Sequence, residues 1–319
     1  MDKIAIIIPC YNEEKTIKKV ISDAKSSLHE AAIYVYDNNS TDNTYDIALK
    51  SGAAVRRESK QGKGRVVRSA FREIDALCYL LVDGDATYSF KKARAMCDLV
   101  LNDNVDMVVG DRLSDAYFTE NKRRFHNIGN RAVRAFINSL FGADIRDVMS
   151  GFRAMSYRFV KSFPITSKGF EIETEMTIHA VDKDLYIESV PVNYRDRPSG
   201  SVSKLNTFSD GYKVILTIVR LFKNYRPLYF FTLVGMLFFI YAGIFLIPIV
   251  VTFWKTGLVP KFPTLIVCGF AVIAGIQSFF GGLILDTIVQ KHKQDFEITL
   301  TELAASSKSR YPDAMDSFS

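Results

Sequence analysis

The sequence predicts an α/β domain built on a mostly parallel sheet, followed by an interfacial helix and two helices that cross a membrane. Short apolar runs alternate with amphipathic stretches through the larger, N-terminal part of the chain. Polar residues and glycines directly follow several of those runs. Near the other end, residues 229–253 and 264–289 form two apolar stretches, each long enough to span a bilayer.

Composition narrows the class of protein. The chain has 319 residues, of which 48% are hydrophobic, enough to bury a full core. Its net charge of +6 is modest and forms no basic tail, so we expect no nucleic-acid partner. Cys10, Cys78, Cys97 and Cys268 lack metal-ligand spacing and fit buried positions in a reducing compartment. The apolar run at the start is stopped by Pro9, which indicates a strand and not a signal peptide.

The elements of the α/β part follow in order. Residues 3–8 predict a buried strand, and residues 9–14 a polar loop. An amphipathic helix comes next, with an apolar face made by Ile17, Val20, Ile21, Ala24 and Leu28. The later expectations are strands at 32–37, 53–56, 79–82 and 105–109, and helices at 65–75, at 128–141 and from 170 onward.

Polar side chains gather where these strands end. In open parallel sheets, ligands bind beyond the carboxyl ends of the strands. Asp83 and Asp85 follow one strand with Gly84 between them, and hard cations such as Mg²⁺ and Mn²⁺ prefer carboxylate oxygens together with substrate phosphates. An Asp-Gly-Asp sequence also suits a turn or a helix cap. The expected crevice is lined by Tyr11, Asn12, Glu13, Asp37, Asn39, Lys63, Asp83 and Asp85.

Two of these loops carry further signals. Asp37 ends a strand, where its carboxylate can accept hydrogen bonds from a ribose or a base edge. Gly62, Lys63 and Gly64 leave free N–H groups and a cation at a helix start, an arrangement that favours an anion. Residues 40–42 read individually as helix caps.

Four short motifs occur together: PCYNEE at 9–14, DNNSTDNT at 37–44, GKG at 62–64 and DGDAT at 83–87. Their order and spacing resemble family-2 glycosyltransferases with the Rossmann-like glycosyltransferase-A fold. The resemblance implies that Asp37 contacts the nucleoside, and that Asp83 and Asp85 hold Mg²⁺ or Mn²⁺ on the diphosphate, with Asp85 as the more direct ligand. Enzymes of this family that make dolichyl-phosphate mannose commonly show Asp-Ala-Asp-Leu-Gln here, whereas in this chain Gly84 and Thr87 replace the Ala and the Gln. The implied nucleotide-sugar-binding residues are Pro9, Tyr11, Asn12, Glu13, Asp37, Asn39, Lys63 and Asp83.

A fifth motif lies in the segment expected to hold the acceptor. RDVMSGFR at 146–153 resembles the Asp-x-x-Ser-Gly-Phe-Arg signature of polyprenyl-phosphate glycosyltransferases. The resemblance implies catalytic roles for Asp85, Asp147 and Arg153. Three acids at the start of the next helix, Glu171, Glu173 and Glu175, could include a base, but they also suit a helix N-terminus. His29, His126, His179 and His292 show no ligand spacing and are expected to be structural.

Clustered cations and hydroxyls close the α/β part at residues 190–204, where a strand carrying Tyr194 and two arginines is expected to enter a turn. Arginine and lysine suit a phosphate monoester, although a basic edge strand that resists aggregation has the same composition. The segment also resembles the acceptor-phosphate loop of the same enzymes. The implied acceptor-phosphate-binding residues are Arg131, Arg153, Arg195, Arg197, Ser203 and Lys204.

The remainder predicts attachment to a lipid bilayer. The expected organisation is a catalytic domain at 1–205, an interfacial amphipathic helix at 206–227, a transmembrane hairpin at 228–290 and a tail at 291–319 that is disordered from about 306. Positive charges flanking the spans place the catalytic domain and both termini in the cytoplasm, at the cell membrane. This anchor would permit homo-oligomers.

The expected function is therefore inverting transfer of a hexose or N-acetylhexosamine from a nucleotide sugar, with a UDP-sugar preferred over a GDP-sugar, to polyprenyl (undecaprenyl) phosphate. UDP-glucose, UDP-N-acetylglucosamine, UDP-galactose and GDP-mannose remain open as donors. A processive polysaccharide synthase would share the first motifs but carries Gln-x-x-Arg-Trp, and the single tryptophan here, Trp254, follows Phe253. An inactive membrane scaffold is the non-enzymatic alternative.

Overall fold

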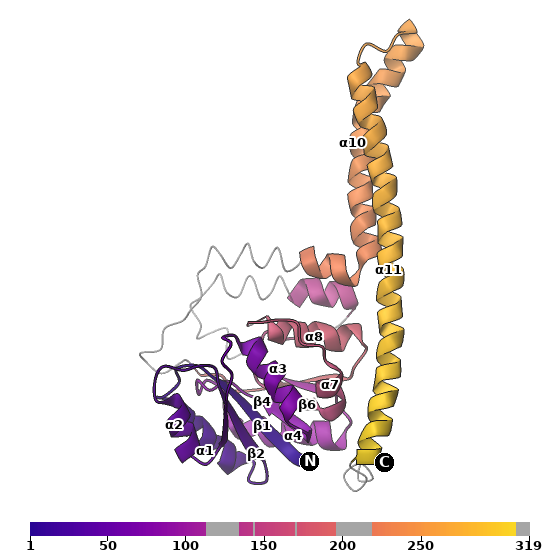
Figure 1. The fold of residues 1–319 in the computed structure, drawn as a ribbon. Coiled ribbons are helices and arrows are strands. Elements are labelled where there is room, and N and C mark those ends of the chain that lie inside the picture. Colours follow the sequence, from indigo (N-terminus) through magenta and orange to yellow (C-terminus); the bar gives the residue numbers. More distant parts are fainter. Residues whose placement is uncertain (113–133, 143, 170, 196–218, 311–319) are drawn as a thin grey trace. The chain divides into compact units, whose positions relative to one another are not determined.

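The structure is a computed structural model that describes residues 1–112, 134–142, 144–169, 171–195 and 219–310 (Figure 1). The chain divides into two compact units. One comprises Met1–Phe208 together with Phe296–Ser319, and the other comprises Ser209–Asp295.

The first unit is built on a seven-stranded sheet with the order β3-β2-β1-β4-β6-β5-β7. Strand β6 runs antiparallel to β4 and β5, and the other neighbours are parallel, which confirms the predicted mostly parallel sheet. The strands are β1 (Asp2–Cys10), β2 (Ala32–Asp37), β3 (Ala54–Arg57), β4 (Ala76–Leu81), β5 (Met107–Asp111), β6 (Arg153–Ser156) and β7 (Ile187–Pro191).

Helices cover both faces of this sheet, so its central strands are apolar on both sides. Along β1, Ile4, Ile6 and Ile8 face one core cluster, and Ala5 and Ile7 face the other. The first cluster includes apolar residues of α1 and α4, and the second those of α3, α7 and α8. The helices are α1 (Ile17–Ser27), α2 (Thr44–Lys50), α3 (Lys63–Glu73), α4 (Ala93–Asn102), α7 (Tyr157–Ser162) and α8 (Ile172–Asp182), with the short η1 (Phe90–Lys92).

The prediction of a strand carrying Tyr194 is wrong. Strand β7 ends at Pro191, whose missing N–H cannot continue the ladder. The chain then crosses to the loop after β4, where Tyr194 forms an isolated antiparallel bridge with Tyr88. The segment after Tyr194 therefore starts beside the acidic tip and not along the sheet edge.

The last part of α11 (Phe262–Arg310) contributes to the first unit. Phe296 is buried in the cluster of α7 and α8, and its ring centroid lies 5.2 Å from that of His179. His179 also contacts the rings of Phe159 and Phe163. Burial lowers the pKa of His179 to about 4, so this ring packs as a neutral aromatic group near pH 7.

The second unit holds α10 (Pro227–Thr256) and the larger part of α11. Both helices are long and apolar enough to cross a membrane, and they run alongside each other (Figure 1). Small residues allow close approach: a Cβ at Gly235 would lie 2.9 Å from the carbonyl oxygen of Gly275. Ser278 Oγ also donates to Phe231 O at 3.0 Å.

The helical boundaries here differ from those expected. Helix α11 continues past residue 290 to Arg310, so residues 306–310, expected to begin a disordered tail, are helical. Of the expected amphipathic helix at 206–227, the structure describes residues 219–225 as helical, and residues 206–218 lie outside the described residues.

Candidate active site

The loops after β1, β2 and β4 are tied together at the carboxyl ends of these parallel strands. The Asn12 side chain accepts from Thr41 N at 2.8 Å, and Asn12 N donates to Ser40 Oγ at 2.9 Å. Thr16 Oγ1 donates to Gly84 O at 2.7 Å. Asn12 therefore braces the crevice, and the three loops hold one another in place.

Left-handed backbone occurs in each of these loops. Asn12, Asn39 and Ala86 have φ values of 55°, 64° and 58°. Asparagine tolerates this region, whereas alanine is strained there. The turn at Ala86 brings the N and Oγ1 of Thr87 to 3.1 and 2.6 Å from Asp85 Oδ1. These two hydrogen bonds thus fix the orientation of the Asp85 carboxylate, and the residue as a whole is 5% exposed.

Asp83 and Asp85 form a pair of neighbouring carboxylates whose chemistry fits a divalent cation. Both carboxylates stand at the tip after β4, and the close approach of Cys10 Sγ leaves no room for a side chain at Gly84. Two carboxylates fit Mg²⁺ or Mn²⁺, which commonly take one or two acids plus substrate phosphates. Among the residues that the structure describes, no group of three or more His, Cys, Asp or Glu side chains could hold a metal alone.

Gly151 of the Ser-Gly-Phe-Arg motif packs against this tip. A Cβ on Gly151 would overlap Asp83 Oδ2 and lie 3.0 Å from Lys63 Nζ. Gly151 N also donates to Tyr88 Oη at 2.9 Å. The motif therefore needs glycine here because the loop before β6 passes directly over the Asp83 carboxylate.

We expect Gly151→Ala to reduce the transfer activity that the motifs imply by about tenfold or more, since displacing the Asp83 carboxylate by a fraction of an ångström would be costly at a metal site. Initial rates at varied Mn²⁺ concentration should show a raised requirement for the metal. Gly281→Ala is the matched control, because a Cβ there meets nothing within 4 Å. Equal rates for the two variants would contradict the expected role of Gly151.

Asp37 ends β2 in a buried position with 0% exposure. Its Oδ2 accepts from Ser40 N at 3.3 Å and lies 3.7 Å from Arg57 Nε. Its Oδ1 has no hydrogen-bond partner among the described residues. Since buried carboxylate oxygens are normally satisfied, Oδ1 is available to a nucleoside hydroxyl or base N–H. Nearby, Asn39 is exposed and Tyr11 half-buried.

Lys63 lies between acids and is itself buried. Its Nζ contacts Asp83 Oδ1 and lies 2.5 Å from Glu173 Oε1 of α8. Burial alone would lower the pKa of Lys63, but attraction to the two carboxylates outweighs it and the pKa is raised. Glu173 was not distinguished in the sequence from Glu171 and Glu175, although it shares the buried face of α8 with Ile172 and Met176.

Asp147 forms a buried ion pair with Arg112, the residue after β5. Arg112 Nε lies 2.7 Å from Asp147 Oδ2 and Nη2 3.0 Å from Oδ1, a bidentate pair. Burial would raise the pKa of Asp147, but Arg112 lowers it overall, so the carboxylate is ionised. Arg112 also lies over the Tyr194 ring, 5.4 Å from its centroid. Sequence reasoning missed Arg112, for which only its position at a strand end gave a signal.

Arg153 is fully buried at the start of β6. Its Nε and Nη2 each donate at 2.8 Å, to Ser150 O and Val148 O, and Nη1 donates to Thr177 Oγ1 at 2.9 Å. Burial lowers the pKa of Arg153 to about 10. The structure therefore places this guanidinium beneath the loop before β6, where it shapes the loop, and does not bring it to the crevice wall.

Arg195, an expected acceptor-phosphate residue, is bonded to the loop that carries the acidic tip. Its N donates to Thr87 O at 2.8 Å, and its side chain is exposed. The adjacent Tyr194 ring packs on Tyr88, with centroids 5.2 Å apart. Arg195 is thus hydrogen-bonded to Thr87, which follows Asp85 by two residues. The other expected acceptor-phosphate residues, Arg131, Arg197, Ser203 and Lys204, lie outside the described residues.

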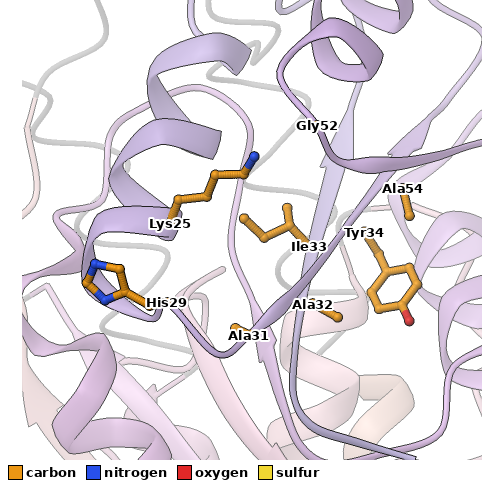
Figure 2. A pocket seen from close by; sticks show the side chains of 8 residues that line it. All are labelled: Lys25, His29, Ala31, Ala32, Ile33, Tyr34, Gly52 and Ala54. Carbon is orange, nitrogen blue, oxygen red and sulfur yellow. The ribbon is translucent and has the colours of Figure 1, made fainter.

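The hollow in Figure 2 lies elsewhere, at the start of β2 and so at the opposite end of the strand from Asp37. Its volume is about 530 Å³, and Lys25 Nζ donates to Ser51 O at 2.8 Å within it. The lining residues are Lys25, His29, Ala31, Ala32, Ile33, Tyr34, Gly52 and Ala54. None of the expected site residues lines it.

Comparison with known proteins agrees with this arrangement. Residues 5–163 match glycosyl transferase family 2. The chain is 33% identical over 297 residues to glycosyltransferase AglJ of Haloferax volcanii, covering 93% of this chain and 97% of that protein. It is 30% identical over 219 residues to a dolichyl-phosphate hexose transferase of the same organism, covering 69% and 93%.

Among solved structures, glucosyl-3-phosphoglycerate synthase from Mycobacterium tuberculosis, in complex with Mn²⁺, UDP-glucose and glycerol 3-phosphate, has a similar fold. The TM-score is 0.54 at 21% identity, over 70% of this chain and 79% of that chain. The first unit therefore has the glycosyltransferase-A fold. The chain belongs to glycosyl transferase family 2 and is a glycosyltransferase, as the motifs predict.

Proposed function

We propose that this glycosyltransferase moves a hexose or N-acetylhexosamine from a UDP-sugar to undecaprenyl phosphate at the cell membrane. The hydrogen bond from Arg195 N to Thr87 O carries the proposal, because it joins the start of the basic acceptor segment to the acidic tip of Asp85. The names of the AglJ and dolichyl-phosphate hexose transferase relatives support the reaction class and a lipid phosphate acceptor.

The donor side follows from the strand-end acids. Asp37 Oδ1 would accept from the nucleoside, and Asp83 and Asp85 would hold Mg²⁺ or Mn²⁺ against the diphosphate. The cation would offset the charge that grows on the departing nucleoside diphosphate. Thr87 keeps the Asp85 carboxylate in one orientation, so this geometry is prepared before the donor binds.

The acceptor side needs orientation more than a base. A phosphate monoester has a second pKa of about 6, so its oxygen is largely ionised near neutral pH. Arg195 would bind that phosphate together with Arg131, Arg197, Ser203 and Lys204, as the motif implies. The phosphate oxygen attacks the anomeric carbon opposite the bond to the diphosphate, and that bond breaks, giving an inverted, β-linked product.

The roles of the acceptor-side motif are indirect. Asp147 holds Arg112 beside Tyr194, and the Arg153 guanidinium holds the loop that carries Gly151. We therefore assign Asp147 and Arg153 to positioning, in place of direct contact with the phosphate. Helices α10 and α11 would anchor the chain in the bilayer, with the catalytic domain on the cytoplasmic side.

The test uses the purified full chain with undecaprenyl phosphate, Mg²⁺ or Mn²⁺ and a panel of UDP- and GDP-sugars. We expect one donor to give a chloroform-soluble monosaccharide-lipid, and EDTA to abolish its formation. A growing polymer would instead support a processive synthase, and failure with every donor would support an inactive scaffold. Either result would contradict the proposal.

A further inference from the structure

The Lys63 ammonium joins two carboxylates from distant parts of the chain. Asp83 stands on the tip after β4, and Glu173 on the first turn of α8. The Lys63 and Glu173 side chains are 7% and 6% exposed, and that of Asp83 is 28% exposed. One acid of the pair therefore faces the crevice, while the other is enclosed.

We propose that Glu173 is a positioning residue that serves as the permanent counter-ion of Lys63, so that Asp83 is free to take up the divalent cation. The inference rests on the proposed function, since it concerns the same metal site. It assigns Glu173 no contact with the sugar or with either phosphate.

Charge balance supports this division of roles. A divalent cation held by Asp83 and Asp85 would stand beside the Lys63 ammonium, and like charges at short range repel in a partly buried site. Asp83 would then turn from Lys63 toward the metal, whereas Glu173 would stay with Lys63. The ammonium would remain at the edge of the site, where it can face the donor diphosphate.

The unsatisfied, buried carboxylate of Glu173 is easier to explain by a role in function than by a role in stability. Its Oε2 is buried and has no hydrogen-bond partner among the described residues. Burying a carboxylate with an unsatisfied oxygen is costly, and a buried ion pair is weak evidence for stability. A pair of hydrophobic residues in place of Lys63 and Glu173 would cost less if these two side chains only packed α8 against α3.

The test measures Mn²⁺ binding to the full chain in detergent, without lipid or nucleotide sugar, by electron paramagnetic resonance. We expect Glu173→Gln to weaken Mn²⁺ binding about tenfold, the size of effect expected from losing one hydrogen bond to a charged group. Thermal unfolding of the variant should stay cooperative. Glu188→Gln is the control, because it removes the same charge from a half-buried side chain on β7, and glutamine can still accept the hydrogen bond from Tyr186 Oη.

Repeating the measurement in a Lys63→Met protein distinguishes competition between Lys63 and the metal for Asp83 from a general loss of negative charge. In Lys63→Met no ammonium competes for Asp83, so adding Glu173→Gln should change Mn²⁺ binding by less than about twofold. Unchanged binding in the single Glu173 variant, or an equal loss in both backgrounds, would overturn the inference while leaving the proposed transfer reaction intact. If the unaltered protein binds no Mn²⁺, both the inference and the proposed metal site are overturned.

Discussion

Replacing Asp85 with asparagine should reduce sugar transfer by about a thousandfold or more, since the cation that would stabilise the leaving group in the proposed reaction would lose a carboxylate ligand. The change keeps the shape of the side chain. Asparagine Oδ1 can still accept from Thr87 N and Oγ1, so the turn at Ala86 should persist. The loss would then report on charge and not on folding.

The measurement is initial-rate formation of lipid-linked sugar, with thermal unfolding as the check on the fold. Asp103→Asn makes the same chemical change at an exposed residue after α4 and should leave the rate unaltered. A normal rate for the Asp85 variant would exclude a metal-dependent reaction through this carboxylate.

The strands that could be predicted from the sequence are those buried on both faces of the sheet, because such strands appear as short continuous apolar runs. Residues 32–37 were expected as a strand, and β2 has the same bounds. Strand β6 was not expected, because it has only four residues and begins with Arg153. Its place between β4 and β5 depends on long-range pairing that local propensity does not encode.

The candidate site divides in a similar way. Asp37, Asp83 and Asp85 could be predicted because parallel strands bring their carboxyl ends to one edge. The partners of the buried charges could not: Lys63 pairs with Glu173, and Arg112 with Asp147, across long stretches of sequence. The sequence motifs contain these charged residues but do not show which of their side chains point into the protein interior.

Arg153 shows the physical reason most directly. As a sequence feature, an arginine in a phosphate-transfer motif indicates an anion contact. In the structure its donors are used by two backbone carbonyls and Thr177, so the cation is solvated by the protein itself. Whether an arginine serves a ligand or a loop depends on backbone geometry, which composition and spacing do not determine.

Arg195→Met should raise the KM for undecaprenyl phosphate by about a hundredfold, because losing hydrogen bonds to a charged group costs about 3 kcal/mol. The KM for the nucleotide sugar should stay within about twofold, since Arg195 contacts the loop of Asp85 through its backbone, which the substitution retains. The KM of Arg195→Lys for undecaprenyl phosphate should lie between those of the unaltered protein and of Arg195→Met, because lysine keeps the charge but cannot form bidentate hydrogen bonds.

Initial rates over a range of lipid concentrations distinguish this result from a general loss of activity. Arg72→Met removes an exposed arginine at the end of α3 and should leave both KM values unchanged. A fall in kcat with an unaltered KM for the lipid phosphate would place Arg195 outside the acceptor site. A raised KM for the nucleotide sugar would place it on the donor instead. Because the Arg195 backbone is bonded to Thr87 O, these kinetics test whether donor and acceptor meet at the Asp85 tip.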